Sequence, residues 1–414
     1  MGAGPSGATA ARLLAEAGLT VLLLERARLP RDKTCGGGLQ AKVFKHLTID
    51  VTPVVRSELH GICFTHGFAE RFTRRNGRPL VYGTLRREFD TFLTEQAIHR
   101  GVKLVDDVRV ETVEPQRDGS ARVVTSTGAY SARVVIGADG VNGAVRRLLN
   151  PESAFFNQAG LSLEIRRDQL AAGSLEGDLM RVDWGTLPSG YAWVFPKGDY
   201  VNIGVGCPVA IARRLRPYLG RFLERERLLP TERVDLDTLP VRGHKLPSYT
   251  PRTRLVQDRI LVVGDAAGLI DPFTGDGISY GIHSATLAAD AVVRHLNGDA
   301  RGLQLYADAV QTEIVPDIVH FRRLMTLFNS FPGMAHDVIR ANDKVWDVFC
   351  WALHGDDAYD VFRRTTLERS QVLWKILDPF TAWYESRRLG RERAGESGFQ
   401  RAVRATIGSI LQRI

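Results

Sequence analysis

Three glycines and one carboxylate near the start of the chain have the spacing of a dinucleotide site. Gly2, Gly4 and Gly7 form a G-x-G-x-x-G stretch at the start of a predicted helix, and 17 residues separate Gly7 from Glu25. Such glycines permit a tight turn and let a pyrophosphate approach the backbone at a helix N-terminus. A carboxylate at Glu25 accepts a hydrogen bond from a ribose hydroxyl. Glycines alone also serve packing, so the correctly placed acid is what favours FAD or NAD.

Two later stretches favour FAD over NAD. Asp265 follows the apolar run 260–263, a predicted strand, and its carboxylate can hold the ribityl chain of a flavin. Gly277 and Ile278 begin a predicted helix whose N-terminus can face the flavin pyrimidine and stabilise negative charge on the reduced ring. A third stretch, the Gly-Ala-Asp-Gly turn at 137–140, either contacts the cofactor or only supports the sheet.

The elements that must position these residues alternate between strand and helix. Around the glycine motif we expect a helix over 8–17 and a strand over 21–24. Further along, the pattern predicts β-hairpins over 58–84, a helix over 88–100, extended segments over 102–116 and 120–127, a strand over 133–136 and a helix over 277–297. Longer alternating segments with Gly and Pro between them predict a mostly β region over 155–250.

These elements predict an α/β fold: a Rossmann-like FAD-binding domain, an inserted and mostly antiparallel β substrate domain, and a helical C-terminal region. The FAD-binding domain is expected to be discontinuous, because the β region interrupts it. The predicted bounds are 1–57, 81–152 and 253–300 for the FAD-binding domain, 58–80 and 153–252 for the β-rich domain, and 301–414 for the helical region.

Only Met1 precedes the first glycine, although such a loop normally follows a β-strand. The first strand of a doubly wound sheet is central, so its loss would open the core. We therefore expect that the first Rossmann strand is missing from this sequence, that Met1 occupies its last position, and that the native protein starts earlier.

The order of the motifs resembles the p-hydroxybenzoate hydroxylase class of flavoproteins. It runs from the glycine loop and Glu25 through Arg86-x-x-Phe89-Asp90 and GADG to GDAAG and GDGI. More narrowly, two stretches resemble the geranylgeranyl reductase family. They are KTCGGGL at 33–39 and Tyr191-Ala-Trp193-Val-Phe195-Pro196, which is followed by Gly204-Val-Gly206. The resemblance covers about residues 2–300, whereas the last hundred residues resemble nothing that we can name.

The resemblance implies an FAD-dependent oxidoreductase that saturates double bonds of a geranylgeranyl-type isoprenoid chain on a lipid, quinone or chlorophyll precursor. An isolated alkene has no carbonyl to polarise, so positioning and a dry apolar pocket must supply much of the catalysis. Tyr191, Trp193 and Phe195 alternate with small or aliphatic residues and would point to one face of a strand. With Gly204 and Gly206, they either form one wall of a prenyl tunnel or belong to an ordinary sheet core.

The same resemblance implies which residues contact the flavin. Cys35 either only lines the flavin edge or, as the candidate catalytic residue, relays a proton through its thiol. Arg86 either meets the cofactor or faces solvent. The implied cofactor-binding residues are Gly2, Gly4, Ser6, Gly7, Glu25, Arg26, Cys35, Gly36, Gly38, Arg86, Val110, Asp265, Gly277 and Ile278.

Composition narrows the partners of the chain. The net charge is +8, from 55 basic and 47 acidic residues, but no zinc-finger or RNA-binding signature occurs, so we expect no nucleic-acid partner. The cysteines Cys35, Cys63, Cys207 and Cys350 lack C-x-x-C spacing, so we expect neither metal nor disulfides. No apolar run of about 18 residues and no signal peptide occurs, so we expect a cytoplasmic protein. Because no second glycine fingerprint exists, NADPH would bind transiently as the electron donor, unless reduced ferredoxin serves instead.

The end of the chain suggests a membrane contact. Residues 399–414 place apolar side chains at helical spacing with arginines on the remaining face. Such a helix either lies in a membrane interface, where a prenylated lipid is found, or packs on the protein body. Residues 372–384 add four aromatic side chains that could serve either purpose. We expect weak peripheral association with membranes.

Two other functions fit parts of the sequence. The Tyr-x-Trp-x-Phe-Pro run is loosely similar to the Trp-x-Trp-x-Ile-Pro run of flavin-dependent halogenases, so a flavin-dependent monooxygenase or halogenase is one alternative. The CGGGL stretch fits the reductases better. The second alternative is a non-catalytic lipid-binding relative, which the absent first strand would permit.

Overall fold

The computed structural model describes residues 1–364, which form two compact units. The first unit contains residues 1–57, 82–160 and 242–322, and the second contains 58–81, 161–241 and the described residues from 323 onward. The chain passes from one unit to the other after residues 57, 81, 160, 241 and 322, and the first two passages lie in the short strands β3 (Ser57–Leu59) and β6 (Val81–Gly83). The predicted aromatic segment 372–384 and the basic helix 399–414 lie outside the described residues. The predicted assignment of separate functions to three regions stays a prediction.

Two pairs of parallel strands form the centre of the first unit. β1 (Leu22–Leu24) pairs with β7 (Lys103–Val105), and β11 (Val135–Gly137) pairs with β18 (Ile260–Val262). The backbone at the start of the chain hydrogen bonds to both pairs. Gly2 N–H donates to the carbonyl of Leu24 at 2.7 Å, and the N–H of Ala138 donates to the carbonyl of Met1 at 2.8 Å. The glycine loop therefore lies at the ends of parallel strands, as the Rossmann-like prediction requires.

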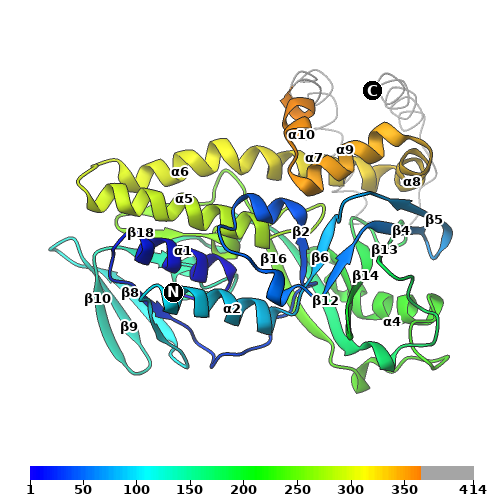
Figure 1. Cartoon of the computed structure of the whole chain (residues 1–414), viewed down its shortest axis with the longest axis horizontal. Coiled ribbons are helices and arrows are strands. Elements are labelled where there is room, and N and C mark those ends of the chain that lie inside the picture. Colours follow the sequence, from blue (N-terminus) through cyan, green and yellow to red (C-terminus); the bar gives the residue numbers. More distant parts are fainter. Residues whose placement is uncertain (365–414) are drawn as a thin grey trace. The chain divides into compact units, whose positions relative to one another are not determined.

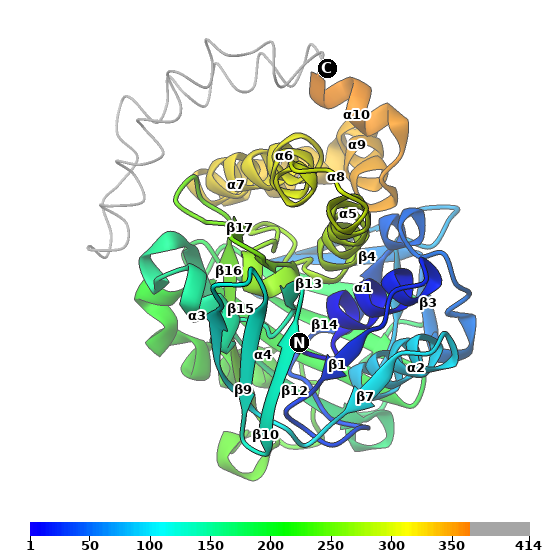
Figure 2. The ribbon, with the colours of Figure 1, turned by 90° about the vertical axis from the view of Figure 1, so that its left-hand side faces the viewer.

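Helices pack on these strands, and Figures 1 and 2 both show α1 beside α5. Helix α1 begins three residues before the predicted start, because Pro5 is tolerated in the first turn and Gly4 provides an extended N-cap. The α5 helix agrees closely with the predicted one. The helices of this unit are α1 (Pro5–Glu16), α2 (Arg86–His99), α3 (Ala144–Leu149), α5 (Ile278–Leu296) and α6 (Gly302–Glu313), and α7 (Val315–Ser330) continues from it.

A small antiparallel sheet completes the first unit. Its order is β10-β9-β8, and β8 and β9 lie within the two predicted extended segments. The strands are β8 (Val110–Pro115), β9 (Ala121–Thr125) and β10 (Gly128–Ala132); the remaining short strands of the unit are β2 (Gly38–Gln40) and β17 (Val256–Gln257).

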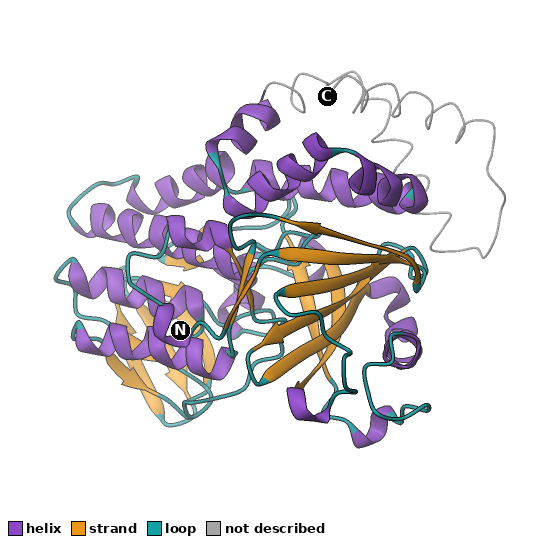
Figure 3. Ribbon diagram, turned by 45° about the vertical axis from the view of Figure 1, so that its right-hand side comes forward, coloured by secondary structure: helices purple, strands orange, loops and turns teal. Residues whose placement is uncertain are grey.

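The second unit is built on a broad sheet, seen as the fan of strands in Figure 3. Its strand order is β12-β15-β14-β13-β4-β5, whereas β16 (Arg242–Ser248) begins the last segment of the first unit. β4 and β13 are parallel, whereas β4–β5, β13–β14 and β14–β15 are antiparallel, which confirms a mostly antiparallel sheet. The strands are β4 (Gly61–His66), β5 (Ala69–Arg75), β12 (Phe156–Arg166), β13 (Leu179–Trp184), β14 (Tyr191–Lys197) and β15 (Tyr200–Pro208).

Helices cover parts of this sheet within the second unit. α8 (Pro332–Ala341) and α9 (Asp343–His354) contribute Ile339, Trp346 and Cys350 to one apolar cluster with Phe64 and Met180 of the sheet. A short α10 (Asp357–Phe362) follows. From residue 302 onward the described elements are all helices, which confirms the helical character predicted there. Within residues 1–364, no helix combines the length and the hydropathy that crossing a bilayer requires.

The region predicted as mostly β also contains a helix, α4 (Leu215–Arg225). Its buried residues recur at helical spacing, which is the reason the segment is helical: Leu215, Tyr218, Leu219, Phe222 and Leu223. The Tyr218 hydroxyl donates to the buried carboxylate of Asp183 on β13, which fastens the helix to the sheet. The region is mostly β as predicted, but α4 itself was not predicted, because the Gly and Pro residues around it are typical of turns between strands.

Candidate functional site

Two glycines of the N-terminal loop are required by close packing. A Cβ on Gly2 would overlap the carbonyl oxygen of Ala138. Gly2 also has a φ of +93°, which residues other than glycine rarely adopt. A Cβ on Gly7 would overlap the carbonyl oxygen of Gly2 itself. These are the roles that a dinucleotide fingerprint gives to its first and third glycines.

Gly4 faces open space instead. The nearest atoms to a Cβ at this position would be the Nη2 atoms of Arg31, at 3.9 Å, and of Arg86, at 4.0 Å. The bare backbone of Gly4 at the start of α1 and the two guanidinium groups thus surround a position that suits an anion. A pyrophosphate fits this arrangement, because the helix N-terminus and both arginines favour negative charge.

Ser6 fills a gap between helices. A Cβ on Gly264 or on Gly281 would overlap its hydroxyl oxygen. The small residues therefore let α1 approach α5 closely. Packing accounts for Ser6 in this structure, and its predicted contact with FAD stays a prediction.

Glu25 lies directly after β1 and is almost completely buried beside the glycine loop. Its Oε2 accepts the backbone N–H of Ala3 at 2.7 Å, and its Oε1 accepts that of Ala27 at 3.1 Å. Arg31 also pairs with it, at 3.3 Å. The carboxylate is thus held in place, whereas the neighbouring Arg26 is exposed, and the contacts of both residues with FAD stay predictions.

Arg86 belongs to a buried chain of charges. Its Nε and Nη2 donate to both oxygens of Asp90, at 2.8 and 2.9 Å, and Arg31 donates to the same carboxylate at 3.1 Å. Asp90 is 0% exposed and Arg86 8%, so the solvent-facing interpretation of Arg86 was wrong. Burial by itself lowers the pKa of Arg86, but Asp90 and Cys35 raise it above the ordinary value. Arg86 therefore remains a cation beside Gly4.

Cys35 is half-buried, unlike the buried Cys63, Cys207 and Cys350. Its Sγ accepts the N–H of Gly37 at 3.3 Å. It also packs against an apolar cluster that includes Leu39 and Ile278, the first residue of α5. The cysteine–glycine stretch and the start of α5 therefore lie together. Gly36 lies in the loop before β2, and Gly38 is the first residue of β2. Proton transfer by Cys35 stays a prediction.

Asp265 forms a second polar cluster with two basic side chains. Its carboxylate lies 3.8 Å from both Lys33 Nζ and His244 Nε2, and these two nitrogens are 2.7 Å apart. Burial alone would raise the pKa of Asp265, but His244 and Lys33 lower it to about 2. Burial, helped by Arg86, lowers the pKa of Lys33. His244 was not predicted, because it lies 211 positions from Lys33 and belongs to no motif.

The turn before α5 is fixed by its own side chains. Asp271 is fully buried and accepts the backbone N–H groups of Phe273, at 2.7 Å, and Thr274, at 3.3 Å. Gly277 caps α5, and a Cβ there would lie 3.2 Å from Oδ1 of Asp265. The predicted ribityl-binding aspartate and the N-terminus predicted to face the flavin are therefore neighbours.

The GADG turn and Val110 have structural roles. Asp139 accepts the N–H of Val145 at 2.8 Å and so caps α3, which supports the interpretation that the turn stabilises the sheet. Val110 begins β8 opposite Thr125 and packs against the main core cluster. Contacts of either with FAD stay predictions. The described residues contain no group of three or more His, Cys, Asp or Glu side chains that could bind a metal.

The aromatic residues of β14 form a separate face in the second unit. Tyr191, Trp193 and Phe195 are half-buried, whereas Ala192 and Val194 between them are fully buried on the opposite face. The ring centroids are 5.8 Å apart between Tyr191 and Trp193, and 6.3 Å apart between Trp193 and Phe195. The three rings thus form one continuous apolar surface.

The neighbouring strand β15 leaves room for these rings. In the register, Gly206 is opposite Tyr191 and Gly204 is opposite Trp193. A Cβ on Gly204 would overlap the indole ring, so the ring lies across the strand where the side chain is missing. The five predicted substrate residues are therefore together on one face of the sheet.

A polar network holds the central ring. Trp193 Nε1–H donates to Oδ1 of Asn202 at 2.9 Å, and Nδ2 of Asn202 donates to Glu164 at 3.4 Å. The fully buried Lys197 also donates to Glu164. Asn202 and Glu164 were not predicted, because polar residues on a strand are ordinarily read as solvent-facing.

Comparisons with known proteins identify the family of the chain. Residues 1–170 match the model of the FAD binding domain family. The digeranylgeranylglycerophospholipid reductase of Methanoculleus marisnigri is 31% identical over 313 residues, which cover 70% of this chain and 74% of that one.

Solved structures show the same fold. A geranylgeranyl bacteriochlorophyll reductase-like protein of Thermoplasma acidophilum has a TM-score of 0.70 at 23% identity, over 82% of this chain and 90% of that one. A flavin-dependent brominase has a TM-score of 0.66 at 18% identity, over 89% and 98%. The fold is shared by a reductase-like protein and by a brominase, so the fold alone does not identify the family, whereas the sequence relationship to the reductases does. This chain belongs to the geranylgeranyl reductase family of FAD-dependent oxidoreductases.

Proposed function

We propose that this protein saturates carbon–carbon double bonds of a geranylgeranyl-type chain carried by a lipid, a quinone or a chlorophyll precursor. The aromatic face of β14 carries the proposal. Its half-buried rings lie side by side, the central ring packs over Gly204 of β15, and a hydrogen bond to Asn202 holds that ring at its edge, which suits a long apolar chain. Relatives whose names specify digeranylgeranylglycerophospholipid support this substrate class.

The residues of the first unit fit FAD. Gly4, Arg31 and Arg86 would hold the pyrophosphate, Glu25 the adenosine ribose, and Asp265 the ribityl chain. The N-terminus of α5, which begins at Ile278, would face the pyrimidine edge of the flavin. FAD, when bound, supplies the hydride that one alkene carbon receives.

The chain's own side chains would orient the substrate and supply the proton. The aromatic face would exclude water and hold the alkene by apolar contacts, because an isolated alkene offers no group for hydrogen bonding. The second alkene carbon must receive a proton, and we assign its delivery to the thiol of Cys35, which solvent then reprotonates. One hydride and one proton convert the double bond to a single bond.

The electron donor and the location belong to the same proposal. NADPH would bind transiently, or a reduced ferredoxin would dock on the basic protein, whose net charge of +8 suits an acidic partner. The same charge suits weak attachment to an anionic membrane, where prenylated lipids are found. We propose a cytoplasmic protein that visits the membrane surface.

Oxygen dependence separates this function from its rival. A flavin-dependent monooxygenase or halogenase is a second candidate because the fold is shared with a brominase. The test is anaerobic incubation of the dithionite-reduced, FAD-loaded protein with geranylgeranyl lipids, followed by mass spectrometry. The reductase adds two hydrogens for each saturated bond without oxygen, whereas products that require oxygen would support the rival.

A further inference from the structure

Lys42 is a buried cation outside the sequence motifs. It lies in a short helix (Ala41–Lys45), is 8% exposed, and places Nζ 3.2 Å from Oδ2 of Asp276. The same ammonium group donates to the hydroxyl of Tyr280 at 3.0 Å and lies 4.1 Å from the centre of its ring. Burying an ammonium group costs free energy, which only its partners can offset, so the burial of Lys42 suggests that its charge has a role at this position.

Gln40, two residues earlier, reaches the same turn. Its Nε2 donates to Oγ1 of Thr274 at 2.7 Å. Its Oε1 is buried and accepts no hydrogen bond from the described residues. Thr274 in turn donates to Asp271. Gln40 and Lys42 thus tie the segment that follows the cysteine–glycine stretch to the turn before α5.

The charges around that turn oppose the helix N-terminus. The first turn of a helix carries about half a positive charge, which is the part that would stabilise negative charge on reduced flavin. Asp276 accepts the N–H of Ser279 at 3.1 Å and so places a carboxylate on this same turn. The buried Asp271 is close by, and its pKa is raised to about 6 by burial, whereas Lys42 lowers it. Without Lys42, two buried carboxylates would outweigh the positive end of α5.

We propose that Lys42 raises the reduction potential of the flavin and positions the turn before α5. Gln40 holds the same turn through its hydrogen bond to Thr274. Lys42 neutralises Asp276 and so keeps the N-terminus of α5 positive, which favours the reduced, anionic form of the cofactor. The inference rests on the proposed FAD site, in which this N-terminus faces the pyrimidine edge. Lys42 would thus influence the reduction potential through its ion pair with Asp276, although Lys42 itself lies outside the cofactor motifs.

Two substitutions of opposite sign test the proposal in the full-length, FAD-loaded protein without substrate. Lys42→Met is expected to weaken the binding of reduced FAD relative to oxidised FAD by about tenfold, and so to lower the reduction potential. Asp276→Asn is expected to shift the potential upward. The double variant is expected to return toward the wild type, a rescue that a merely structural role would not produce. Spectroelectrochemical titration measures the potential.

The matched control is Lys45→Met, which removes an exposed lysine from the same short helix and is expected to leave the potential unchanged. Equal potentials for Lys42→Met, Asp276→Asn and the wild type would overturn the inference. If the Lys42→Met variant does not retain FAD, the reduction potential of Asp276→Asn alone tests the inference, and an unchanged potential there would overturn it. If the wild-type protein itself does not bind FAD, the proposed cofactor site fails, which is a distinguishable result.

Discussion

The indole Nε1–H of Trp193 donates a 2.9 Å hydrogen bond to Oδ1 of Asn202, which is two positions along β15 from Gly204, the register partner of Trp193. Asn202 is itself held by Glu164, and Glu164 by Lys197. The central ring of the aromatic face is therefore fixed at its polar edge, and the aromatic face is the surface that we propose for the substrate. This relationship links the packing of the sheet to the proposed substrate.

The first prediction concerns Gly204. Because a Cβ there would overlap Trp193, Gly204→Ala should displace the ring and lower the free energy of unfolding by roughly 1–3 kcal/mol. The KM for a prenyl substrate should rise while FAD affinity stays constant. Steady-state kinetics and flavin titration measure both. Gly220→Ala is the control, since its Cβ would meet no atom closer than 3.7 Å. An unchanged KM would remove Trp193 from the substrate site.

The second prediction concerns Gly4. Gly4→Ala places a methyl group in the space that faces Arg31 and Arg86, where the pyrophosphate is proposed to bind. The dissociation constant of FAD should rise at least about tenfold, which corresponds to about 1.4 kcal/mol, with little change in thermal stability. Quenching of flavin fluorescence measures the affinity. Gly77→Ala, with no atom within 4 Å of its Cβ, is the control. Unaltered FAD affinity in Gly4→Ala would contradict the assignment.

The third prediction concerns Arg86. Arg86→Met removes a partner of the fully buried Asp90 and should destabilise the protein by roughly 3–5 kcal/mol, because Asp90 would be left with one partner fewer. The double variant Arg86→Met with Asp90→Leu should recover stability but not FAD affinity. Urea unfolding and flavin titration separate the two effects. FAD affinity that returns with stability would show that Arg86 acts only on the fold.

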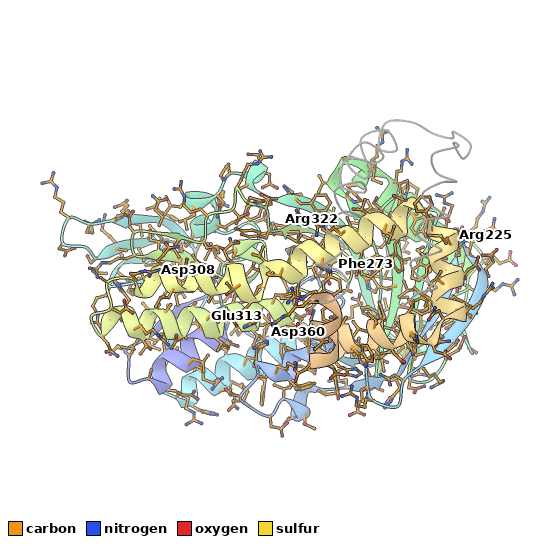
Figure 4. The ribbon with its side chains drawn as sticks, turned by 90° about the horizontal axis from the view of Figure 1, so that it is seen from above. Arg225, Phe273, Asp308, Glu313, Arg322 and Asp360 are labelled. Carbon is orange, nitrogen blue, oxygen red and sulfur yellow. The ribbon has the colours of Figure 1, made fainter. Side chains whose placement is uncertain are left out.

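The fourth prediction concerns pH. The rings of His46 and His283 are stacked with their centroids 3.7 Å apart, and His283 lies 3.0 Å from Glu313 at the end of α6 (Figure 4). Burial lowers the pKa of each histidine from 6.5 to about 4, and for His46 the charge of His283 adds to the effect. Between these values the unfolded chain binds more protons than the folded one, so stability falls as the pH falls from about 6.5 to 4.

Replacing one ring tests this dependence. His283→Gln should reduce the loss of melting temperature between pH 7 and pH 4.5, whereas His99→Gln, at an exposed position, should not. Differential scanning calorimetry at the two pH values provides the comparison. Equal pH dependence in the wild type and His283→Gln would show that the stacked pair does not titrate as described.

Local patterns accounted for most of the fold and for the parts of both candidate sites that lie on single segments. The glycine loop, Glu25 and the alternating aromatics of β14 are each set by spacing along a single segment, so they could be predicted. The contacts of Lys33 with His244 and of Lys42 with Asp276 could not, since they join segments more than two hundred residues apart. Helix α4 was missed although its apolar spacing was visible, because the surrounding turn residues suggested strands.

The most direct test of the central claim is the product of a single reaction. The FAD-loaded protein is reduced without oxygen and incubated with a geranylgeranyl lipid, and the lipid is analysed by mass spectrometry. The account predicts a stepwise gain of two hydrogens per saturated double bond, with a marked loss of product in Trp193→Ala. Recovery of the unchanged lipid from wild-type protein that has bound and reduced its FAD, across lipid, quinone and chlorophyll-precursor substrates, would contradict it.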